Sequence, residues 1–484
     1  MTKRRIRTRL RIARTALQGA AAALMLAGLG GALPAEAQSL QDALALAYQN
    51  NPTLLAERAN LRAQDEGVAQ ALSGWRPTVT VNGAAGRQWL TQVPSRTGEP
   101  SITGWPGAAG ITITENLYQG GKTTAQTRAA EFTVLAERAN LQLVEQTTLL
   151  NAATAYINVV LAQAVLQLNV NNEQVLTTQL EATRDQFAVG EVTRTDVSQA
   201  EASLETAKAG RIQAQNQLQV ARANYRTVIG DIPGELKDPG EPAGLPPSRE
   251  DARHMAQREN PNVLVANYNE GAARANIDVQ FSGLLPSLSI QGLAQKQQQQ
   301  FSASDTSEQA IVEAILSVPI YTGGLVDSQV RQAKQVLNQR RLQLEQSQRQ
   351  AIQDATTFWE NEQSARAQIA SFEATVAADK IALEGTRQEQ QVGLRTVLDV
   401  LNAEQALLQA EVNLATARHD AAVAAYNELN AIGHLTARDL RLPVPYFDPT
   451  AHYNEVRDQW FGTEVKDQDT VTNRPPAPRA GTGQ

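Results

Sequence analysis

The sequence of 484 residues contains no cysteine. The absence of cysteine excludes a disulfide framework, a cysteine-ligated zinc or iron–sulfur site, and a thiol nucleophile. It also excludes a lipid chain attached to an N-terminal cysteine. If the protein is held at a membrane, the attachment must therefore come from its fold.

Charged and aromatic residues are also scarce. Charged residues make up 19% of the chain and aromatic residues 5%, whereas about a quarter of a typical soluble domain is charged. Alanine, glutamine, asparagine, leucine and threonine take their place. With a net charge of −7, the chain lacks the basic surface that a nucleic-acid-binding protein needs. Length alone would allow about three domains.

Long hydrophobic runs are confined to the N-terminal leader. Seven basic residues precede an apolar run over 16–33, and Ala35-Glu36-Ala37 follows as a small-x-small cleavage site. This order predicts a secretory signal peptide over residues 1–37, cleaved before Gln38. The alternative is a transmembrane anchor, although the run is close to the lower length limit for a span. Cleavage would remove the seven basic residues and Glu36, which changes the net charge from −7 to −13.

No later segment reaches about 20 consecutive apolar residues, so the sequence predicts no further transmembrane helix. An exported chain of this kind is a soluble periplasmic protein, a secreted protein or an outer-membrane β-barrel. The acidic, cysteine-free composition is typical of a bacterial envelope protein.

The chain is a tandem duplication. Asn51-Pro52 and Pro77 recur 209 residues later as Asn260-Pro261 and Pro286. A second set recurs 203 residues later: Tyr118/Tyr321, Gly120-Gly121/Gly323-Gly324, Val189-Gly190/Val392-Gly393, Asp196/Asp399, Glu201/Glu404 and Gly230/Gly433. The offset changes once, between Pro286 and Tyr321. Matches at fixed offsets over most of a chain predict two copies of one structural unit.

The sequence of each repeat predicts a helix, two strands, and a very long helix that is followed by a chain reversal and a returning helix. The change in offset falls between the paired strands, in loops over about 91–107 and 297–309, because exposed loops absorb insertions. The first repeat is expected over 38–230 and the second over 252–433, with a Pro/Gly-rich linker over 231–251. Residues 434–461 are expected to dock on the body and 462–484 to form a disordered tail.

Strands are expected at about 77–90, 108–118, 286–296 and 310–320. In the first three, aliphatic side chains alternate with small polar ones, whereas the fourth alternates poorly. About ten residues suffice to cross a bilayer at a tilt, with one face toward lipid and one toward a wet lumen. An ordinary antiparallel sheet on a soluble core fits the pattern about equally well. Four aromatic residues near the strand ends would suit a membrane-interface girdle: Trp89, Trp105, Tyr118 and Tyr321.

The helices are unusually long. Residues 122–187 contain neither proline nor glycine, and 325–391 contain only Gly385. At 1.5 Å per residue each stretch would span roughly 100 Å, so each must pack along other helices. The second returning helix carries two adjacent heptad seams: Val400, Ala403, Leu407, Ala410, Leu414, Ala417, Ala421 and Ala424, and beside them Leu401, Leu408, Ala415, Ala422 and Leu429. Two seams allow contacts with neighbours on both sides, as a ring of helices requires.

The duplicated helix–strand–strand–helix unit, the Tyr-x-Gly-Gly after each second strand, and residues 392–401 (VGLRTVLDVL) resemble the TolC family of outer-membrane efflux proteins. Residues 442–461 are more similar to members that serve type I protein secretion than to drug-efflux lipoproteins. The resemblance implies an α+β membrane protein that acts as a homotrimer. Each protomer of the trimer would contribute four strands to a 12-stranded outer-membrane β-barrel. The helices would continue this barrel as a long α-helical barrel across the periplasm.

In this family, coiled helices held by polar links close the periplasmic end, and the turns near 190–196 and 393–399 correspond to that end. The resemblance implies that Arg395 links to Thr195 and Asp196 on neighbouring helices, and that Asp399 belongs to an acidic ring facing the pore. From the residues alone, Arg395 and Asp399 are better described as a solvated i,i+4 helix pair.

Two gate positions depart from the family pattern. Gln390 stands where a linking tyrosine is common, and Asn402 stands where a second ring aspartate is common. The bonds of the closed state are therefore expected to differ, and the cation-binding ring to be weaker.

No constellation in the sequence indicates an enzyme, a cofactor or a metal. The four histidines are dispersed, and none has metal-ligand spacing to another: His254, His419, His434 and His452. No glycine-rich phosphate loop, nucleophile elbow or metal-binding helix motif is present. The sequence therefore predicts no catalytic, cofactor-binding or metal site.

The predicted function is a passive outer-membrane exit duct in a tripartite export system. Substrate would come from an inner-membrane ABC transporter or proton-driven pump through a periplasmic adaptor (membrane fusion) protein. Type I protein secretion is the preferred interpretation, and multidrug or small-molecule efflux is the alternative. From another class, a periplasmic coiled-coil adaptor or scaffold remains, although an adaptor normally has one helical hairpin and compact β domains.

Overall fold

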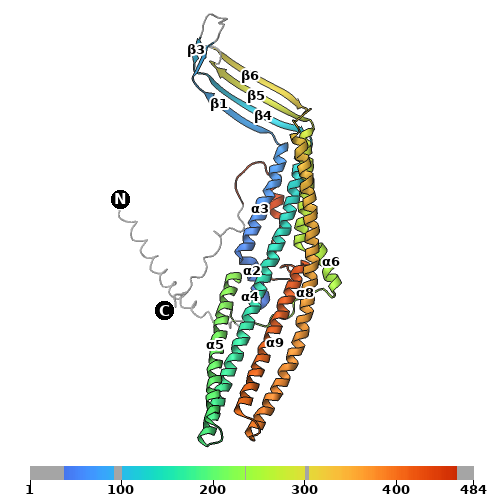
Figure 1. Ribbon diagram of the computed structural model, residues 1–484. Helices are drawn as coiled ribbons and strands as arrows, with labels where there is room; N and C mark the ends of the chain where they lie inside the picture. Colours follow the sequence, from blue (N-terminus) through green and yellow to red (C-terminus); the bar gives the residue numbers. More distant parts are fainter. Residues whose placement is uncertain (1–37, 92–100, 235, 300–304, 466–484) are drawn as a thin grey trace, which may run out of the picture.

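A computed structural model describes residues 38–91, 101–234, 236–299 and 305–465. Long helices run side by side through most of the molecule, and an antiparallel sheet extends from one end of them (Figure 1). Two helical turns form the opposite end. The predicted signal peptide over 1–37 and residues 466–484 of the predicted tail lie outside the described residues.

The two halves contain the same helices at the same lengths. The first half has α2 (Leu40–Asn50), α3 (Pro52–Leu72), α4 (Lys122–Ala188) and α5 (Arg194–Ile229); the second has α6 (Arg249–Glu259), α7 (Pro261–Phe281), α8 (Leu325–Gln391) and α9 (Val397–Ile432). Counterparts have 11, 21, 67 and 36 residues in both halves. The short 3-10 turns η1 (Ser73–Trp75) and η2 (Ser282–Leu284) follow α3 and α7. The two sequence offsets therefore relate whole elements.

An Asn-Pro pair divides the helical segment before the strands into two helices in each half. The Asn51 side chain caps α3 by accepting a hydrogen bond from the Thr53 amide at 2.9 Å, and proline occupies the first turn, where no donor is needed. The Asn51 amide group also donates to the Val228 carbonyl at 3.0 Å. Asn260 makes the equivalent bond to Ala431 at 2.8 Å. In the first half, Asn51 thus joins the start of α3 to the end of α5. In the second half, Asn260 joins the start of α7 to the end of α9.

The main sheet has the antiparallel order β1-β4-β5-β6, with bounds Thr78–Ala85, Gly107–Gln119, Ser287–Gln298 and Thr306–Ser317. The strand expected over 77–90 ends at Ala85; β2 (Gln88–Thr91) pairs instead with β3 (Ser101–Gly104) in a separate hairpin. The fourth strand begins at Thr306 rather than near 310. The registers repeat the duplication, because Thr78 pairs with Thr114 and their counterparts Ser287 and Ser317 pair with each other.

The two faces of the main sheet differ in chemistry. Cross-strand partners share a face, so the registers gather aliphatic side chains on one of them: Val79, Val81, Ile111, Ile113, Leu288, Ile290, Val312 and Leu316. Glu115 and, toward the outer end, the ion pair of Lys296 with Glu308 interrupt this face. The opposite face carries mainly polar side chains, among them Thr78, Thr80, Thr112, Thr114, Ser289 and Gln291, and also Leu293, Ile311 and Ile315 near the β6 edge. In the described part of the chain no helix packs across either face, so a soluble core beneath this sheet has no second layer within the chain.

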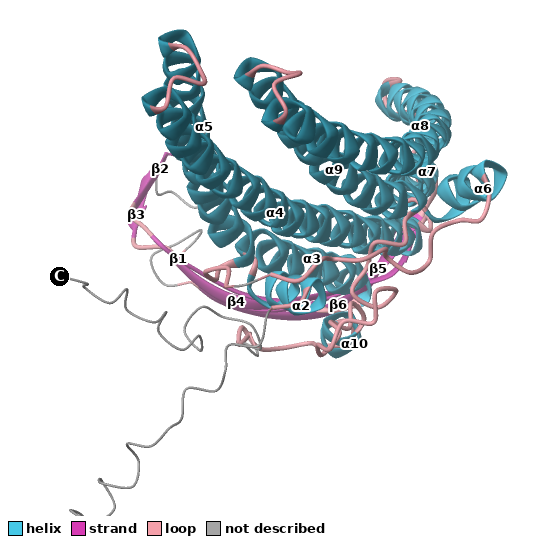
Figure 2. Ribbon diagram, turned by 90° about the horizontal axis from the view of Figure 1, so that it is seen from below, coloured by secondary structure: helices cyan, strands magenta, loops and turns pink. Residues whose placement is uncertain are grey.

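The long helices form a curved row, with α5 and α8 at its two ends when seen from below (Figure 2). Near the sheet the contacts follow the order α3, α4, α7, α8, and toward the turns α4 contacts both α5 and α9, while α9 contacts α8. The seam residues Ala410 and Ala417 of α9 are buried, and so are Ala207 and Ala214, their counterparts 203 residues earlier in α5. Small side chains at these positions let the helix axes approach closely.

The main core lies where α2, α4, α5, α6 and α9 meet. Tyr156 and Tyr225 are fully buried there, and the Tyr156 hydroxyl lies 2.8 Å from the Gln38 carbonyl oxygen and 2.7 Å from that of Lys237. Among the described helices, α4 is long and apolar enough to cross a membrane by length and composition, but 44% of that apolar window is buried within the chain. The apolar character of α4 is thus partly explained by packing.

The segment after α9 runs along α3 toward the sheet and includes α10 (Ala451–Val456). It is held at three successive points: Arg58 over the Phe447 ring at 5.2 Å, Asp65 with His452 at 3.3 Å, and Arg76 with the Gln459 carbonyl at 2.6 Å. The first and last of these contacts, at Arg58 and Arg76, are 18 residues apart, which corresponds to about 27 Å along a helix axis. We call residues 442–465 the C-terminal strap.

Candidate functional site

The six predicted gate residues lie at the two helical turns farthest from the sheet: Thr195, Asp196, Gln390, Arg395, Asp399 and Asn402. The chain reverses at Gly190 and Gly393, whose φ angles of 83° and 79° are left-handed. Glycine takes this conformation without strain, which suits it to end a helix. The two turns are therefore built alike, and the differences between them lie in their side chains.

Asp196 and Asp399 both close a capping box at the start of a returning helix. The Asp399 carboxylate accepts from the Thr396 amide at 2.9 Å and from the Thr396 hydroxyl at 2.8 Å. The Asp196 carboxylate does the same with Thr193, at 2.8 and 2.7 Å. The donors on Thr396, the backbone amide first, lower the pKa of Asp399. The capping role of these carboxylates was not foreseen, although Thr-x-x-Asp ahead of an apolar run is a capping signal.

Arg395 lies in the turn before α9 and bonds within its own turn. Its Nε donates to Glu389 at 2.9 Å, and this hydrogen bond is the main cause that raises the Arg395 pKa. Within the described chain, no hydrogen bond joins Arg395 to Thr195 or Asp196. Any link from Arg395 to those residues would therefore have to form in another arrangement of the helices or between copies.

Behind the turns, each hairpin carries an equivalent ion pair. Arg184 on α4 pairs with Glu201 on α5 at 2.7 Å, and Arg387 on α8 pairs with Glu404 on α9. Both residues of the second pair lie 203 positions after those of the first. The sequence pattern included the recurrence of Glu201 as Glu404, but the equal recurrence of Arg184 as Arg387, which is visible at the same offset, was overlooked. Each ion pair therefore joins the two helices of its hairpin close to the turn that connects them.

The four predicted interface aromatics divide between the two ends of the sheet. Trp89 and Trp105 lie at the end away from the helices, with the Arg87 guanidinium 4.6 and 5.7 Å from their rings. Tyr118 and Tyr321 lie at the helix end: Tyr118 is the second-to-last residue of β4, and Tyr321 follows the end of β6 by four residues. All four are exposed, from 45% for Tyr118 to 85% for Tyr321. The 13 residues of β4 at a tilt of about 45° would rise roughly 30 Å between these levels.

A paired-carboxylate cluster on α3 and α4 was missed by the sequence analysis. Asn60 on α3 donates to Glu137 at 2.7 Å, and Asn140 on α4 donates to Glu57 at 2.6 Å. Burial first, and then the hydrogen bond with Glu57, raise the pKa of Glu137 to about 7. The signal was available: the heptapeptide LAERANL occurs at both 55–61 and 135–141. The two copies meet on adjacent helices and exchange equivalent hydrogen bonds.

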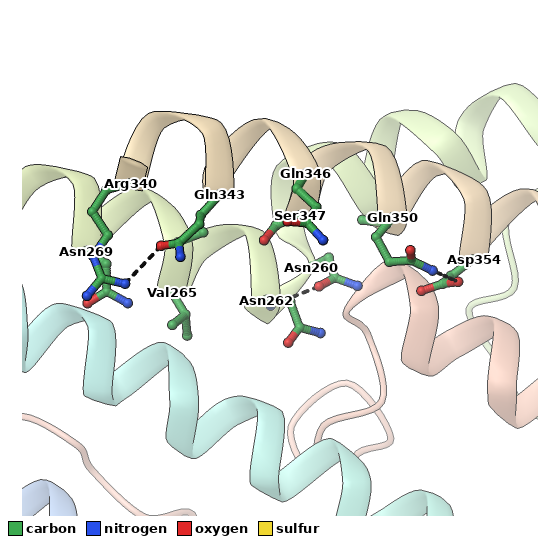
Figure 3. Close-up of a pocket in the computed structure, with 12 residues that line it drawn as sticks. Asn260, Asn262, Val265, Asn269, Arg340, Gln343, Gln346, Ser347, Gln350 and Asp354 are labelled. Carbon is green, nitrogen blue, oxygen red and sulfur yellow. Dashed lines mark hydrogen bonds between the residues drawn. The ribbon is translucent and has the colours of Figure 1, made fainter. Parts of the chain in front are cut away.

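The same positions in the second half form an open polar groove instead. Arg340 and Gln343 on α8 take the places of Glu137 and Asn140, and they bond to each other at 2.9 Å. The groove between α7 and α8 has a volume of about 550 Å³ and is lined mainly by amide side chains (Figure 3). It offers hydrogen-bonding groups to water but no acid–base pair. A groove lined by such side chains is suited to a surface that contacts water.

The histidines remain dispersed in the structure. His254, His419, His434 and His452 each lie near a different carboxylate. Among the described residues, no group of three or more histidine, aspartate or glutamate side chains is placed to hold a metal ion. The arrangement does not identify a reactive centre in this part of the chain; its distinctive features are the two-faced sheet, the long helices and their turns.

Comparison with known proteins agrees with this architecture. A family model described as outer membrane efflux protein matches residues 43–231 and 252–433. The chain is 36% identical to the outer membrane efflux protein BepC of Brucella suis, over 92% of this chain and 97% of that protein. It is 29% identical to the outer membrane protein TolC of Vibrio cholerae, over 84% and 92% of the two chains. The resemblance to the TolC family is confirmed.

Two further comparisons concern export and fold. The alkaline protease secretion protein AprF of Pseudomonas aeruginosa is 28% identical over 57% of this chain and 59% of that protein. The crystal structure of the outer membrane protein VceC from Vibrio cholerae superposes with a TM-score of 0.69, at 20% identity, over 81% of this chain and 96% of that one. At this identity, the structural likeness concerns the fold.

Proposed function

This chain belongs to the outer membrane efflux protein family, and from that membership we propose that three copies form the passive outer-membrane exit duct of a tripartite export system. The observation that carries the proposal is the sheet. Its aliphatic face is exposed and uncovered by any described helix, and it continues directly into helices of 67 residues. Such a sheet is stable in lipid, and such helices reach far into the periplasm.

The trimer is supported by the open edges of the sheet. Strands β1 and β6 have no partner on their outer sides among the described residues, and an unpaired edge is not tolerated within a membrane. Four strands cannot close on themselves, but three copies would give the 12-stranded barrel expected of this family. The polar face of the sheet would then line the lumen, and the aliphatic face would meet lipid.

The helices support a duct that continues below the barrel. Each long helix spans roughly 100 Å, and the curved row in one copy would be one third of a ring. The amide-rich groove between α7 and α8 is the kind of surface that such a ring can expose to water. The duct contains no energy source of its own in this proposal, so transport is driven by the inner-membrane ABC transporter or proton-driven pump, through a periplasmic adaptor.

For the exported cargo, we propose type I protein secretion. The likeness of residues 442–461 to secretion members and the similarity to AprF support this choice. The alternative, small-molecule or multidrug efflux, is supported by the efflux protein BepC, which matches more of the chain. A periplasmic adaptor or scaffold, the other class considered from the sequence, does not account for the uncovered two-faced sheet.

For the gate, we propose that the two turns close the periplasmic end and open when partners bind the open form better. Arg395 would exchange Glu389 for Thr195 and Asp196 of a neighbouring hairpin. Asp399 would face the pore. Gln390 and Asn402 would make this end less tightly linked and less acidic than in family members that carry tyrosine and aspartate there.

Deletion of the gene followed by complementation tests the proposed cargo. Loss of one or a few secreted proteins from the culture medium, with unchanged drug susceptibility, is the expected result for protein secretion. Increased susceptibility with an unchanged set of secreted proteins would replace this cargo by small molecules. Recovery of the protein in the soluble periplasmic fraction rather than the outer membrane would reject the duct altogether.

A further inference from the structure

Three exposed aromatic side chains gather at the junction between the helices and the sheet. Trp75 lies in η1, directly before Arg76-Pro77 and the start of β1, and is 40% exposed. Trp460 and Phe461, near the end of the C-terminal strap, are 58% and 87% exposed. Large aromatic side chains left in water at one level of a molecule indicate a contact surface.

The strap is fixed in place at this junction. The Arg76 guanidinium donates to the Gln459 carbonyl at 2.6 Å and lies 4.9 Å from the Trp460 ring centroid. The Gln459 side-chain amide donates to the Phe461 carbonyl at 3.0 Å. The backbone around the two aromatic residues is therefore tied to the last turn before β1, while their rings remain exposed.

The level of this surface is set by the strands. Arg76 is two residues before β1, and the aliphatic face of the sheet begins at Val79, which is 62% exposed. Tyr118 and Tyr321 lie at the same helix end of the sheet. Tryptophan and tyrosine favour the boundary between hydrocarbon and headgroups. The aromatic surface therefore continues the lipid-facing band on its periplasmic side.

We propose that Trp460 and Phe461, together with Trp75, insert into the headgroup region of the inner leaflet of the outer membrane as a C-terminal aromatic anchor. This proposal rests on the proposed function, because it takes the sheet as the membrane-spanning part. It gives the C-terminal strap a role beyond covering α3: the strap ties the helical body to the membrane surface. In a chain without cysteine, such an anchor is a second attachment that needs no covalent lipid.

The charges around the anchor indicate which lipids it needs. Arg457 is paired with Glu131 at 3.6 Å, and the acidic residues Asp458 and Glu464 flank Trp460-Phe461 in the sequence, so Arg76 and Arg457 form no basic excess here. Attraction by the negative surface potential of anionic lipid would require an excess of basic residues. The contact is therefore driven by aromatic burial, and we expect it to be insensitive to ionic strength and to the fraction of anionic lipid.

Tryptophan fluorescence in phosphatidylcholine vesicles tests the anchor. The contribution of Trp460 is the difference between the wild-type protein and Trp460→Phe. We expect this contribution to shift to shorter wavelength in vesicles, and to be quenched more by lipids brominated near the headgroup than by lipids brominated deep in the chain. The result should be the same when anionic lipid or salt is added.

A second variant separates the anchor from the duct. Val81→Trp places a reporter on the aliphatic face of β1, where quenching by bromolipid shows that the barrel itself is inserted. If Val81→Trp is quenched but Trp460 is accessible to aqueous acrylamide, or is shielded from both quenchers by protein, the anchor is wrong and the duct stands. If neither reporter is quenched by lipid, the proposed membrane-spanning role of the sheet fails first.

Discussion

Glu57 and Glu137 meet because one heptapeptide occurs on two adjacent helices, and their environment departs from that of a solvated glutamate. Burial disfavours the charged form, and a neighbouring carboxylate favours retention of one proton between the pair. The pKa of Glu137 is therefore raised to about 7. The free energy of unfolding is linked to pH wherever a pKa differs between folded and unfolded chains.

The paired carboxylates should make the helical body less stable as pH rises. Between the usual glutamate pKa of about 4.5 and about 7, the folded chain binds more protons than the unfolded chain, so stability falls across this window and levels off above it. Glu137→Gln mimics the protonated form. We expect it to raise the thermal midpoint at pH 8 by roughly 1 °C, since screening at this half-exposed site limits the gain to about 1 kcal/mol and the entropy of unfolding of so long a chain is large.

At pH 5, Glu137→Gln and the wild type should melt alike, as followed by circular dichroism. Glu181→Gln, on an exposed part of the same helix, is the matched control and should leave the pH dependence unchanged. An equal response from both variants would show that general surface charge, and not the pair, sets the dependence.

At the scale of elements, the long helices follow from composition and the strand bounds do not. The stretches without proline or glycine correspond to α4 and α8, because Gly-Gly precedes each and Val-Gly follows each. The break between β1 and β2 falls at Gly86-Arg87, and the alternation of aliphatic residues across that break gave no warning of it. Local pattern specifies helix ends well here, whereas strand ends depend on partners distant in sequence.

Of the gate residues, sequence reasoning could locate the turns but not the bonds. Arg395 prefers Glu389, which the family pattern did not indicate, and Asp196 is engaged in capping α5. Arg395→Ala and Asp196→Ala should each raise the ion conductance of the protein in planar lipid bilayers, because each removes one side of the proposed link. Conductance equal to that of the wild type would sink the assignment.

The capping role of Asp196 requires its own control. Thr193→Ala removes the same capping box, at a cost of about 1 kcal/mol, but leaves the carboxylate in place. We expect Thr193→Ala to conduct as the wild type does. If Thr193→Ala opens the channel as far as Asp196→Ala, loosening of α5 and not a lost link with Arg395 explains the effect.

For the whole molecule, the duplication specifies how copies would join. Within the chain, Thr114 on β4 pairs with Gln291 on β5. The counterpart of Thr114 in the second repeat is Ser317 on β6, 203 residues later, and the counterpart of Gln291 in the first repeat is Asn82 on β1, 209 residues earlier. If protomers join as the repeats do, Ser317 of one protomer therefore lies opposite Asn82 of the next. Paired residues in a sheet have Cα atoms about 4.5–5.5 Å apart, close enough for a disulfide.

Cysteine pairs test this register without interference, because the chain has no cysteine of its own. We expect Asn82→Cys with Ser317→Cys to give covalent trimers on oxidation in outer membranes, seen by denaturing electrophoresis without reductant. Ala84→Cys with Ser317→Cys, displaced along β1 by two residues on the same face, should cross-link poorly. Efficient bonding of the displaced pair, or a ladder that stops at dimers, would contradict the proposed closure.

The equal lengths of the paired helices also constrain how the gene can change. An insertion of two turns in α4 and α5 alone would leave a step at the far end, where the two hairpins now finish level. Natural selection should therefore remove length changes in one repeat unless the other repeat acquires the same change. The loops between the paired strands need not have equal lengths in the two repeats. The change of the sequence offset from 209 to 203 shows that their lengths do differ. Descendants of this duplication should diverge in their outer loops while their two pairs of long helices keep a common length.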